Sequence, residues 1–393
     1  MVNIVFDILS AQPQGNTKFH GGGEYTKHIL REFLGMYGEL DSVKVSVCLN
    51  EDSFVDDWIK EKKNKGVITV YNVKSTEQII ELLNQLSISN KIRFFAGQIY
   101  DYSKYSLPKS VIGIGTCHGL RMLEKPRDVV MLFYTSGINN IKTFIKLFLL
   151  RNRYKNAAYN VYKKSIETFQ YIVTDSRFSE YSIRNHFNTI NIGNIYTFYP
   201  MTDMQEGCTL RGIDNIKHED YIMIISADRW IKNAYRGIAA IDGLYSMSKL
   251  SSIQTRVYGK YPEKCKKTIK NISRFEFYDY VESEELKRAY SECVLFVYPT
   301  LNEGFGLPPL EAMQYGKTCV ISSVCSLPEV YGDAVYFINP YDVTEIQIRI
   351  LEAIDHKIPE SKIAERVNQI EQRQKADTQK ICNLIYGREI LDK

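Results

Sequence analysis

The sequence feature that most limits the fold is a regular alternation of short apolar runs with longer helical stretches. In the first half of the chain the apolar runs are 2–8, 43–49, 67–73, 92–96, 111–115 and 171–174. In the second half they are 221–226, 255–258, 275–278, 294–298, 318–322 and 334–338. Strands that are apolar on both faces and separated by helices are typical of parallel sheets covered by helices. The pattern predicts an α/β protein.

A second constraint is that this pattern occurs twice along the chain. The stretch between the two occurrences, 199–220, has no strand or helix period and carries turn formers and mixed charge, which favours a linker. We therefore expect two doubly wound, Rossmann-like domains, 1–200 and 201–375, that face each other across a cleft. A C-terminal helix at 376–393 is expected to pack back on the first domain. Ligands bind beyond the carboxyl ends of such strands, so each domain can hold one ligand.

The composition excludes several classes of protein. With 44% hydrophobic and 24% charged residues, the chain matches soluble globular proteins, so neither disorder nor a membrane span is expected. A formal charge of +4 on 393 residues is too small to indicate nucleic-acid binding. The eight cysteines lack paired spacing and are expected to be buried thiols in a reducing compartment. The chain starts in a strand-like run without a basic and then apolar leader, so the cytoplasm is the expected location.

Three consecutive glycines, Gly21 to Gly23, precede a helical pattern in which apolar residues recur every four positions. Bare amides at a helix start, together with the helix dipole, can bind a phosphate. The alternative is that the glycines only permit a tight turn. Two sharper phosphate motifs are incomplete, because Thr26 occupies the third glycine position of a dinucleotide fingerprint and Glu311 the first glycine position of a P-loop.

Residues 141–164 break the alternation with a basic amphipathic stretch. It places seven Lys and Arg residues among apolar ones and contains no acidic residue. A basic amphipathic helix can lie on an anionic membrane surface. The alternative is a helix whose apolar face belongs to the core and whose basic side chains are solvated. The one-sided charge favours the membrane.

The richest stretch for chemistry is 294–340. A strand ends before a glycine-containing loop, and Pro308 and Pro309 can open the following helix because its first positions need no N–H donor. Glu303 lies on the loop and Glu311 in the first helical turn. Carboxylates accept hydrogen bonds from hydroxyl-rich ligands, and Glu311 alone would more often complement the helix dipole. The N–H groups of the loop can cradle a phosphate or a sugar hydroxyl. These belong to Gly304, Phe305, Gly306 and Leu307.

This stretch, "EGFGLPPLEAM" followed by "SLPEVYGDAVYFINP", resembles the retaining nucleotide-sugar glycosyltransferases of the GT-B fold, specifically glycosyltransferase family 4, the group 1 transferases. The Glu-x7-Glu motif of that family is complete. The resemblance implies that Glu303 contacts the donor sugar and that Glu311 holds the ribose hydroxyls of the nucleotide. It extends more weakly over most of the chain.

Two further stretches of the second half carry the resemblance. "IISADRWIKNAYRGI" matches the family's first strand and its two cations for the diphosphate, which implies that role for Arg229 and Lys232. Two cations at a strand end would neutralise a pyrophosphate and the charge that grows on it as the glycosidic bond breaks. Arg236, one turn later, is expected on the surface. In "FYDYVESEEL" the backbone near Tyr280 and Val281 is expected to meet the base.

The first half of the chain resembles the family more weakly. "HGGGEYTKHIL" corresponds to the family's glycine loop, so Gly22 and Gly23 are expected to let the backbone approach the donor phosphates or sugar. In "VIGIGTCHGLRML", His118 matches a histidine that reaches the donor sugar, with Gly119 in place of the usual aspartate. "YIVTDSRFSEYSI" places Ser176 and its neighbour Arg177 near the cleft.

The resulting hypothesis is a retaining, metal-independent glycosyltransferase that moves a hexose from a nucleoside diphosphate sugar to an acceptor hydroxyl. No cofactor beyond the donor is expected, and the chain has no Asp-x-Asp pair. The expected acceptor is a glycan or lipid-linked glycan in bacterial surface polysaccharide assembly, with peripheral contact to the inner membrane face through 141–164. The alternatives are another GT-B enzyme, such as a sugar-nucleotide epimerase, and a non-catalytic protein that binds sugar nucleotides.

Overall fold

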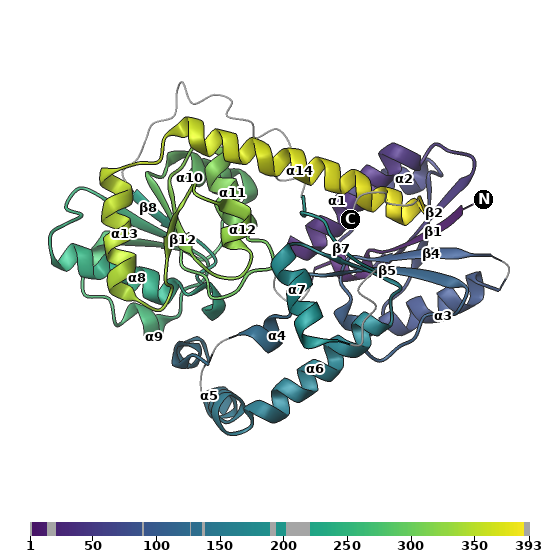
Figure 1. Cartoon of the computed structure of the whole chain (residues 1–393), viewed down its shortest axis with the longest axis horizontal. Helices are drawn as coiled ribbons and strands as arrows, with labels where there is room; N and C mark the ends of the chain where they lie inside the picture. Colours follow the sequence, from purple (N-terminus) through teal and green to yellow (C-terminus); the bar gives the residue numbers. More distant parts are fainter. Residues whose placement is uncertain are drawn as a thin grey trace. The chain divides into compact units, whose positions relative to one another are not determined.

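Two α/β units, each built on its own parallel sheet, make up the chain in the computed structural model (Figure 1). The first unit consists of 1–120, 157–206 and 371–393, and the second of 121–156 and 207–370. The residues that the structure describes are 2–13, 21–88, 90–125, 127–135, 138–188, 194–201 and 221–388. The expected linker lies mostly outside them.

The first unit has a seven-stranded sheet in the order β3-β2-β1-β4-β5-β6-β7, and every strand pair is parallel. The strands are β1 (Val2–Asp7), β2 (Val43–Leu49), β3 (Ile68–Asn72), β4 (Ile92–Ala96), β5 (Val111–Cys117), β6 (Tyr171–Thr174) and β7 (Ile195–Thr197). The chain reverses its direction across the sheet between β1 and β4, where ligands of doubly wound sheets bind. The short strand β7 was not predicted from the sequence.

The second unit has a six-stranded parallel sheet in the order β10-β9-β8-β11-β12-β13. The strands are β8 (Tyr221–Ile224), β9 (Gln254–Tyr258), β10 (Phe275–Tyr278), β11 (Leu295–Tyr298), β12 (Cys319–Ser322) and β13 (Tyr336–Ile338). The strand order is that of a doubly wound fold, as in the first unit, with its reversal between β8 and β11. The predicted fold class of two Rossmann-like sheets is confirmed.

The helices of the first unit cover its sheet with apolar faces. They are α1 (Gly21–Tyr37), α2 (Asp57–Asn64), α3 (Thr76–Leu86), α7 (Arg177–His186), the carboxyl-terminal part of α14 (Glu360–Tyr386), and the 3-10 turns Leu9–Ala11 and Tyr100–Tyr102. The four-residue spacing of apolar side chains in α1 puts Ile29 and Phe33 on one face, where Phe33 packs 5.5 Å from Phe6. Ile381 and Ile385 of α14 belong to the same core.

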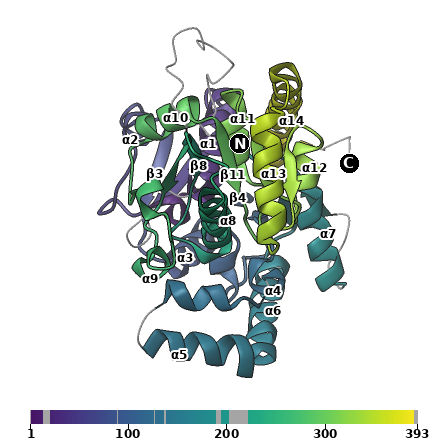
Figure 2. The same ribbon diagram turned by 90° about the vertical axis from the view of Figure 1, so that its left-hand side faces the viewer.

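The helices of the second unit are α8 (Ala234–Ser246), α9 (Glu263–Lys266), α10 (Ser283–Glu292), α11 (Leu307–Gln314), α12 (Leu327–Tyr331), α13 (Val343–Asp355) and the start of α14. Helices α8 and α13 pack side by side (Figure 2). Buried residues of both, including Ile238 and Ile346, share one core with strand residues such as Val257 and Val297. This core supports the carboxyl ends of β8 and β11, where the candidate site begins.

The segment 121–156 belongs to the second unit, although the sequence-based division places it with the first domain. It contains α4 (Arg121–Glu124), a 3-10 helix (Val129–Tyr134), α5 (Ile138–Phe144), a π-helical turn (Ile145–Leu149) and the start of α6 (Arg151–Glu167). The single helix expected over 141–164 is therefore wrong. Leu150 leaves helical geometry at φ −110° and ψ 18° and separates α5 with its π turn from α6 (Figure 1).

The cysteines agree with the expectation drawn from their spacing. All seven described cysteines are free, and only Cys325 is not fully buried. Burial raises the pKa of Cys293 to about 12. Cys208 lies outside the described residues.

Candidate active site

The loop between β11 and α11 positions the central carboxylate of the site. Gly306 ends this loop with φ 92° and serves as the N-cap of α11. A Cβ atom there would lie 2.5 Å from Cδ2 of Leu327, so only glycine fits without displacement. The carbonyl groups of Phe305 and Gly306 accept hydrogen bonds from Ser326 Oγ and Tyr331 OH on the side of α12. The loop that carries Glu303 is therefore fixed at its carboxyl end.

Glu303 is 6% exposed and accepts three hydrogen bonds on a single oxygen, Oε1. The donors are Lys232 Nζ at 2.5 Å, Tyr298 OH at 2.7 Å and Thr300 Oγ1 at 2.8 Å. No described residue donates a hydrogen bond to Oε2. The three donors fix the carboxylate in one orientation and leave its second oxygen for another group.

Lys232 reaches Glu303 from a 3-10 turn, Trp230–Lys232, that follows β8. Asn233 holds the end of this turn in the left-handed region, with φ 58°. Its side-chain amide donates to the carbonyl groups of Pro299 at 2.9 Å and Pro340 at 2.8 Å. These bonds offset the cost of the strained backbone and place the ammonium group beside the β11 loop.

The buried pair has an asymmetric electrostatic environment. Burial alone would raise the pKa of Glu303, but Lys232 first and then Arg121 outweigh it, so the pKa is lower than usual. Burial lowers the pKa of Lys232 to about 8, opposed by the carboxylate of Glu303 and reinforced by the guanidinium of Arg229. Near pH 7 the pair therefore carries both charges.

Glu311 lies in the first turns of α11 and is partly buried. Tyr290 OH donates to its Oε2 at 2.7 Å. Burial raises the pKa of Glu311, while the bond from Tyr290 and the charge of Lys232 act in the opposite direction. Lys232 thus acts electrostatically on both carboxylates of the Glu-x7-Glu motif.

Arg229 is exposed at the start of the Lys232 turn. Its guanidinium donates to Ser226 Oγ at 3.1 Å, and no described carboxylate forms an ion pair with it.

Arg236 does not match its expected surface position. It forms a two-pronged ion pair with Asp128, at 2.7 and 3.1 Å, and its side chain is 17% exposed. Val281 lies partly buried in the loop between β10 and α10.

A second cluster of predicted residues lies in the first unit. Gly21 to Gly23 form the first turn of α1, not a loop ahead of it. A Cβ atom on Gly22 would lie 2.9 Å from Gln98 Nε2 and 3.3 Å from His118 Nε2, so the missing side chain lets His118 approach the helix start. Gly23 is buried in the same turn.

His118 follows β5 and is held by both ring nitrogens. Nδ1 lies 2.8 Å from Asp175 Oδ2, and Nε2 lies 2.9 Å from the carbonyl oxygen of Gly97. Both ring nitrogens therefore lie at hydrogen-bond distance from an oxygen atom, which fixes the orientation of the imidazole. Asp175 is buried and was not selected from the sequence, although it directly follows a buried strand. Its neighbour Ser176, expected near the cleft, caps α7 through a bond from the Ser179 N–H group.

The predicted site residues are thus divided between the two units. Glu303, Lys232, Arg229, Glu311 and the loop 304–307 belong to the second unit, together with Val281. Gly22, Gly23 and His118 belong to the first. Sequence reasoning missed Tyr298 and Thr300 as well as Asp175, because a tyrosine and a threonine near a strand end carry no distinguishing pattern.

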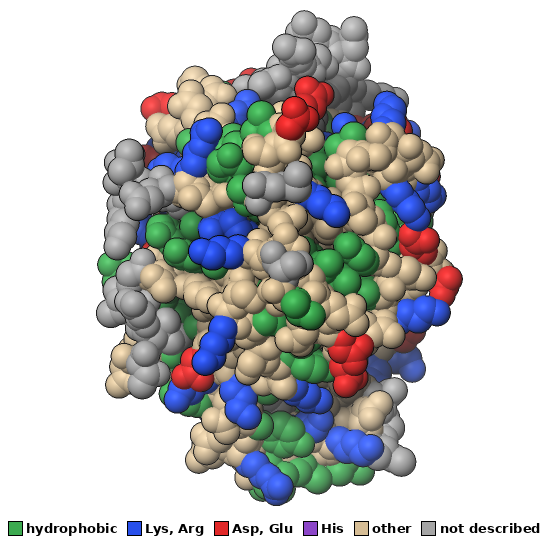
Figure 3. Space-filling view, turned by 90° about the vertical axis from the view of Figure 1, so that its right-hand side faces the viewer, with side chains coloured by type: hydrophobic (Ala, Val, Ile, Leu, Met, Phe, Trp, Pro, Cys, Tyr) green, Lys and Arg blue, Asp and Glu red, His purple; other side chains and the backbone are tan. Residues whose placement is uncertain are grey.

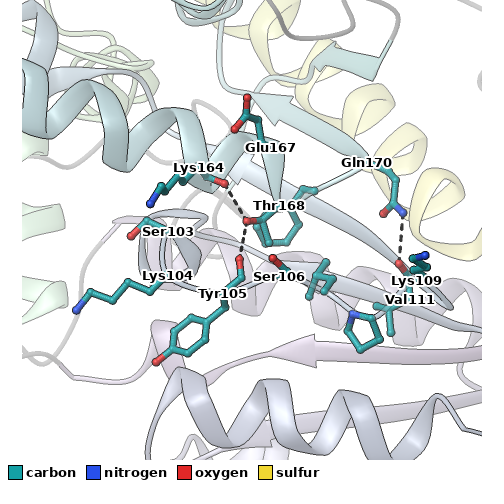
Figure 4. Close-up of a pocket in the computed structure, with 13 residues that line it drawn as sticks. Ser103, Lys104, Tyr105, Ser106, Lys109, Val111, Lys164, Glu167, Thr168 and Gln170 are labelled. Atoms are coloured by element: carbon teal, nitrogen blue, oxygen red, sulfur yellow. Dashed lines mark hydrogen bonds between the residues drawn. The ribbon is translucent and has the colours of Figure 1, made fainter.

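A pocket of about 540 Å³ in the first unit is not part of either cluster (Figure 4). It lies near Val111, at the amino end of β5, whereas the predicted residues follow the carboxyl ends of the strands. Thr168 Oγ1 donates a hydrogen bond to the carbonyl oxygen of Tyr105, and Gln170 Nε2 donates one to the carbonyl oxygen of Val111 (Figure 4). Among the described residues, no group of three or more His, Cys, Asp and Glu side chains could hold a metal ion.

Part of the chain also matches a known protein family. Residues 211–375 match the family described as "Glycosyl transferases group 1". The chain carries a group 1 glycosyl transferase domain. The group 1 domain contains Glu303, Glu311, Arg229 and Lys232, and it confirms the resemblance to the group 1 transferases.

Curated relatives that the chain matches are mannosyltransferases by name. The serotype-specific mannosyltransferase WbdA of Escherichia coli is 45% identical over 80 residues, which are 20% of this chain and 10% of WbdA. The match thus spans about a tenth of the length of WbdA. The O-antigen chain mannosyltransferase RfbU of Salmonella typhimurium (strain LT2) is 23% identical over 323 residues, 79% of this chain and 82% of RfbU.

Solved structures share the fold at low identity. Sucrose-phosphate synthase from Thermosynechococcus elongatus has a TM-score of 0.66 at 14% identity and covers 98% of both chains. Anabaena HepE, solved in complex with UDP-glucose, has a TM-score of 0.61 at 14% identity and covers 98% of this chain and 99% of its own. The GT-B fold expected from the resemblance is confirmed.

Proposed function

We propose that the chain is a retaining glycosyltransferase that moves a hexose from a nucleoside diphosphate sugar to an acceptor hydroxyl without a divalent metal. The observation that carries this proposal is Glu303, a buried carboxylate fixed by three donors beside two basic side chains at the carboxyl end of β11. The group 1 domain and the sugar-nucleotide complex of HepE support the donor class.

In this proposal the donor diphosphate lies against Arg229 and Lys232. Their charges stabilise the negative charge that grows on the diphosphate as the glycosidic bond breaks. Glu303 uses Oε2 to orient the donor sugar and to stabilise positive charge on its anomeric carbon, and it transfers no proton. Glu311 accepts hydrogen bonds from the ribose hydroxyls. Gly22 and His118 of the first unit stay proposed donor contacts, and the imidazole is oriented by its hydrogen bonds to Asp175 and to the carbonyl oxygen of Gly97.

The test is the variant Glu303→Gln, which keeps the shape of the side chain but loses its charge. We expect the rate of sugar transfer to fall by roughly two orders of magnitude or more, while nucleoside diphosphate binding remains. Transfer is measured as nucleoside diphosphate release in a panel of sugar nucleotides and glycan acceptors. A variant that transfers sugar as fast as the native protein would remove Glu303 from the mechanism.

The finer proposal concerns the acceptor. Because RfbU is named as an O-antigen chain mannosyltransferase, a mannose donor and a bacterial surface glycan acceptor are the first pair to test. A protein that binds sugar nucleotides but releases no diphosphate with any acceptor would favour the non-catalytic alternative. Conversion of the donor to an epimer without an acceptor would favour the epimerase.

We further propose that the basic segment, residues 141–164, brings the protein to an anionic membrane surface that holds a lipid-linked acceptor. Its exposed apolar side chains include Ile141 at 63%, Phe144 at 46%, Leu149 at 70% and Leu150 at 39%. At the lower end of the face in Figure 3, Lys and Arg side chains lie beside hydrophobic ones. None of the described helices is long and apolar enough to cross a bilayer, so the proposed contact is peripheral.

A further inference from the structure

The short helix α4 contacts the loop that carries Glu303. Its last residue, Glu124, accepts a hydrogen bond from Asn302 Nδ2 at 2.8 Å, and Asn302 directly precedes Glu303. Asn302 is buried and also contacts Cys325 Sγ at 3.3 Å. A residue from the first half of the sequence is therefore bonded to the neighbour of the central carboxylate.

The chain that follows α4 is anchored to the same unit at further points. Asp128, only 2% exposed at its side chain, forms the two-pronged ion pair with Arg236 at the start of α8. Phe133 stacks on Tyr235 with ring centres 5.2 Å apart. Together with the hydrogen bond from Asn302 to Glu124, these contacts fix α4 relative to the β11 loop. Helix α4 is therefore held against the second unit by these contacts.

Arg121, the first residue of α4, brings a third cation to the cluster around Glu303. Its charge lowers the pKa values of both Glu303 and Lys232, so the guanidinium lies within electrostatic reach of the pair. The residue is exposed, and no described carboxylate forms an ion pair with it. Glu124, on the same short helix, is already bonded to Asn302.

The charge balance of the cluster indicates what Arg121 can bind. Lys232 is neutralised by Glu303, whereas Arg121 and Arg229 have no carboxylate partner among the described residues. Two uncompensated guanidinium groups match the two negative charges of a sugar nucleotide diphosphate. Guanidinium groups also bind phosphate oxygens through two parallel hydrogen bonds.

We propose that Arg121 is a donor-binding residue that contacts the diphosphate together with Arg229, held in place by the Glu124–Asn302 bond. The inference rests on the proposed function, since it names a further residue of the same donor site. It assigns α4 to donor binding, although this helix lies outside the matched family region 211–375.

The experiment compares Arg121→Ala, Arg121→Lys and Met122→Ala by titration calorimetry with UDP, GDP and ADP and with the corresponding monophosphates. Met122 is the matched control, because it lies on the same helix and is 51% exposed. For whichever base the native protein binds, Arg121→Ala should weaken diphosphate binding by about tenfold or more and monophosphate binding less, and Arg121→Lys should recover part of the loss. Met122→Ala should bind like the native protein.

The outcomes separate the two proposals. If the native protein binds none of the nucleotides, the proposed donor class is wrong. If the native protein binds a diphosphate and Arg121→Ala binds it equally well, with unchanged sugar transfer, the assignment of Arg121 is overturned. Equal losses in Arg121→Ala and Met122→Ala would also overturn it, because they would indicate a general disturbance of α4. Thermal unfolding of each variant shows whether the fold is kept.

Discussion

At the scale of single residues, Glu303 and Lys232 show how burial and pairing set the charge state of a site. Either group alone would be costly to bury in its charged form. Together with the hydroxyl groups of Tyr298 and Thr300, they satisfy each other at hydrogen-bond distance. Burial lowers the pKa of Lys232 to about 8, although the pairing with Glu303 raises it, so the loss of this proton can be followed in binding experiments.

Nucleoside diphosphate affinity should therefore decrease on the alkaline side. In the proposed donor site, the Lys232 ammonium is protonated below pH 8 and contributes to phosphate binding, and as pH rises through 8 it loses its proton and this contribution. We expect affinity to fall by about tenfold between pH 7 and pH 9, measured by titration calorimetry.

The control for this prediction is Lys232→Arg, because a guanidinium stays protonated over this range. Its affinity should be lower at pH 7, since the larger group fits the buried position poorly, but it should change little up to pH 9. A native protein whose affinity is constant from pH 7 to pH 9 would contradict the role of the ammonium group.

At the scale of secondary structure elements, the turn into α11 depends on one glycine. Gly306 has φ 92°, and a side chain there would meet Leu327 at 2.5 Å. We expect Gly306→Ala to lower the free energy of unfolding by about 1–3 kcal/mol, from backbone strain and local overpacking. Sugar transfer should fall as well, because the loop also positions Glu303.

The matched substitution is Gly35→Ala in α1, where a Cβ atom would meet nothing within 4 Å. In an exposed helix position, alanine is favoured over glycine by about 0.5–1 kcal/mol. Urea unfolding of both variants should therefore give changes of opposite sign. Equal effects would mean that the left-handed conformation at Gly306 carries no special cost.

Most strands could be predicted from the sequence because their periods are local. The predicted ranges 43–49, 92–96, 171–174 and 275–278 are those observed for β2, β4, β6 and β10. Strand β7, only three residues long, is too short to carry a period. The break between α5 and α6 was missed because a continuous amphipathic pattern does not reveal a π-helical turn.

The residues of the candidate site could be predicted only where they belong to a sequence motif. Glu303 and Glu311 follow from the Glu-x7-Glu spacing, and both lie within reach of Lys232 in the structure. The position of α4 could not be predicted. It depends on contacts such as Asp128 with Arg236, which are 108 positions apart. Sequence spacing cannot identify such pairs before the fold is known.

At the scale of the whole molecule, the proposed membrane contact of the basic segment depends on its exposed apolar side chains and on its charge. Each apolar side chain that enters a lipid interface contributes about 1.5–3 kcal/mol if it is fully buried there. Anionic headgroups add roughly 1 kcal/mol for each basic residue near the surface, and salt screens this attraction. The exposed side chains of Ile141 and Leu149, among basic neighbours, provide both contributions.

The protein should therefore float with vesicles that contain anionic phospholipid, less with purely zwitterionic vesicles, and less again at high salt. The double variant Ile141→Glu and Leu149→Glu should lose vesicle binding but keep its thermal stability, since these side chains are 63% and 70% exposed. Ile348→Glu is the matched control, because Ile348 is 56% exposed on α13, away from the segment. Flotation that is absent in the native protein, or equal in all three proteins, would refute the membrane contact. Neither result would affect the donor site, whose residues lie outside the segment.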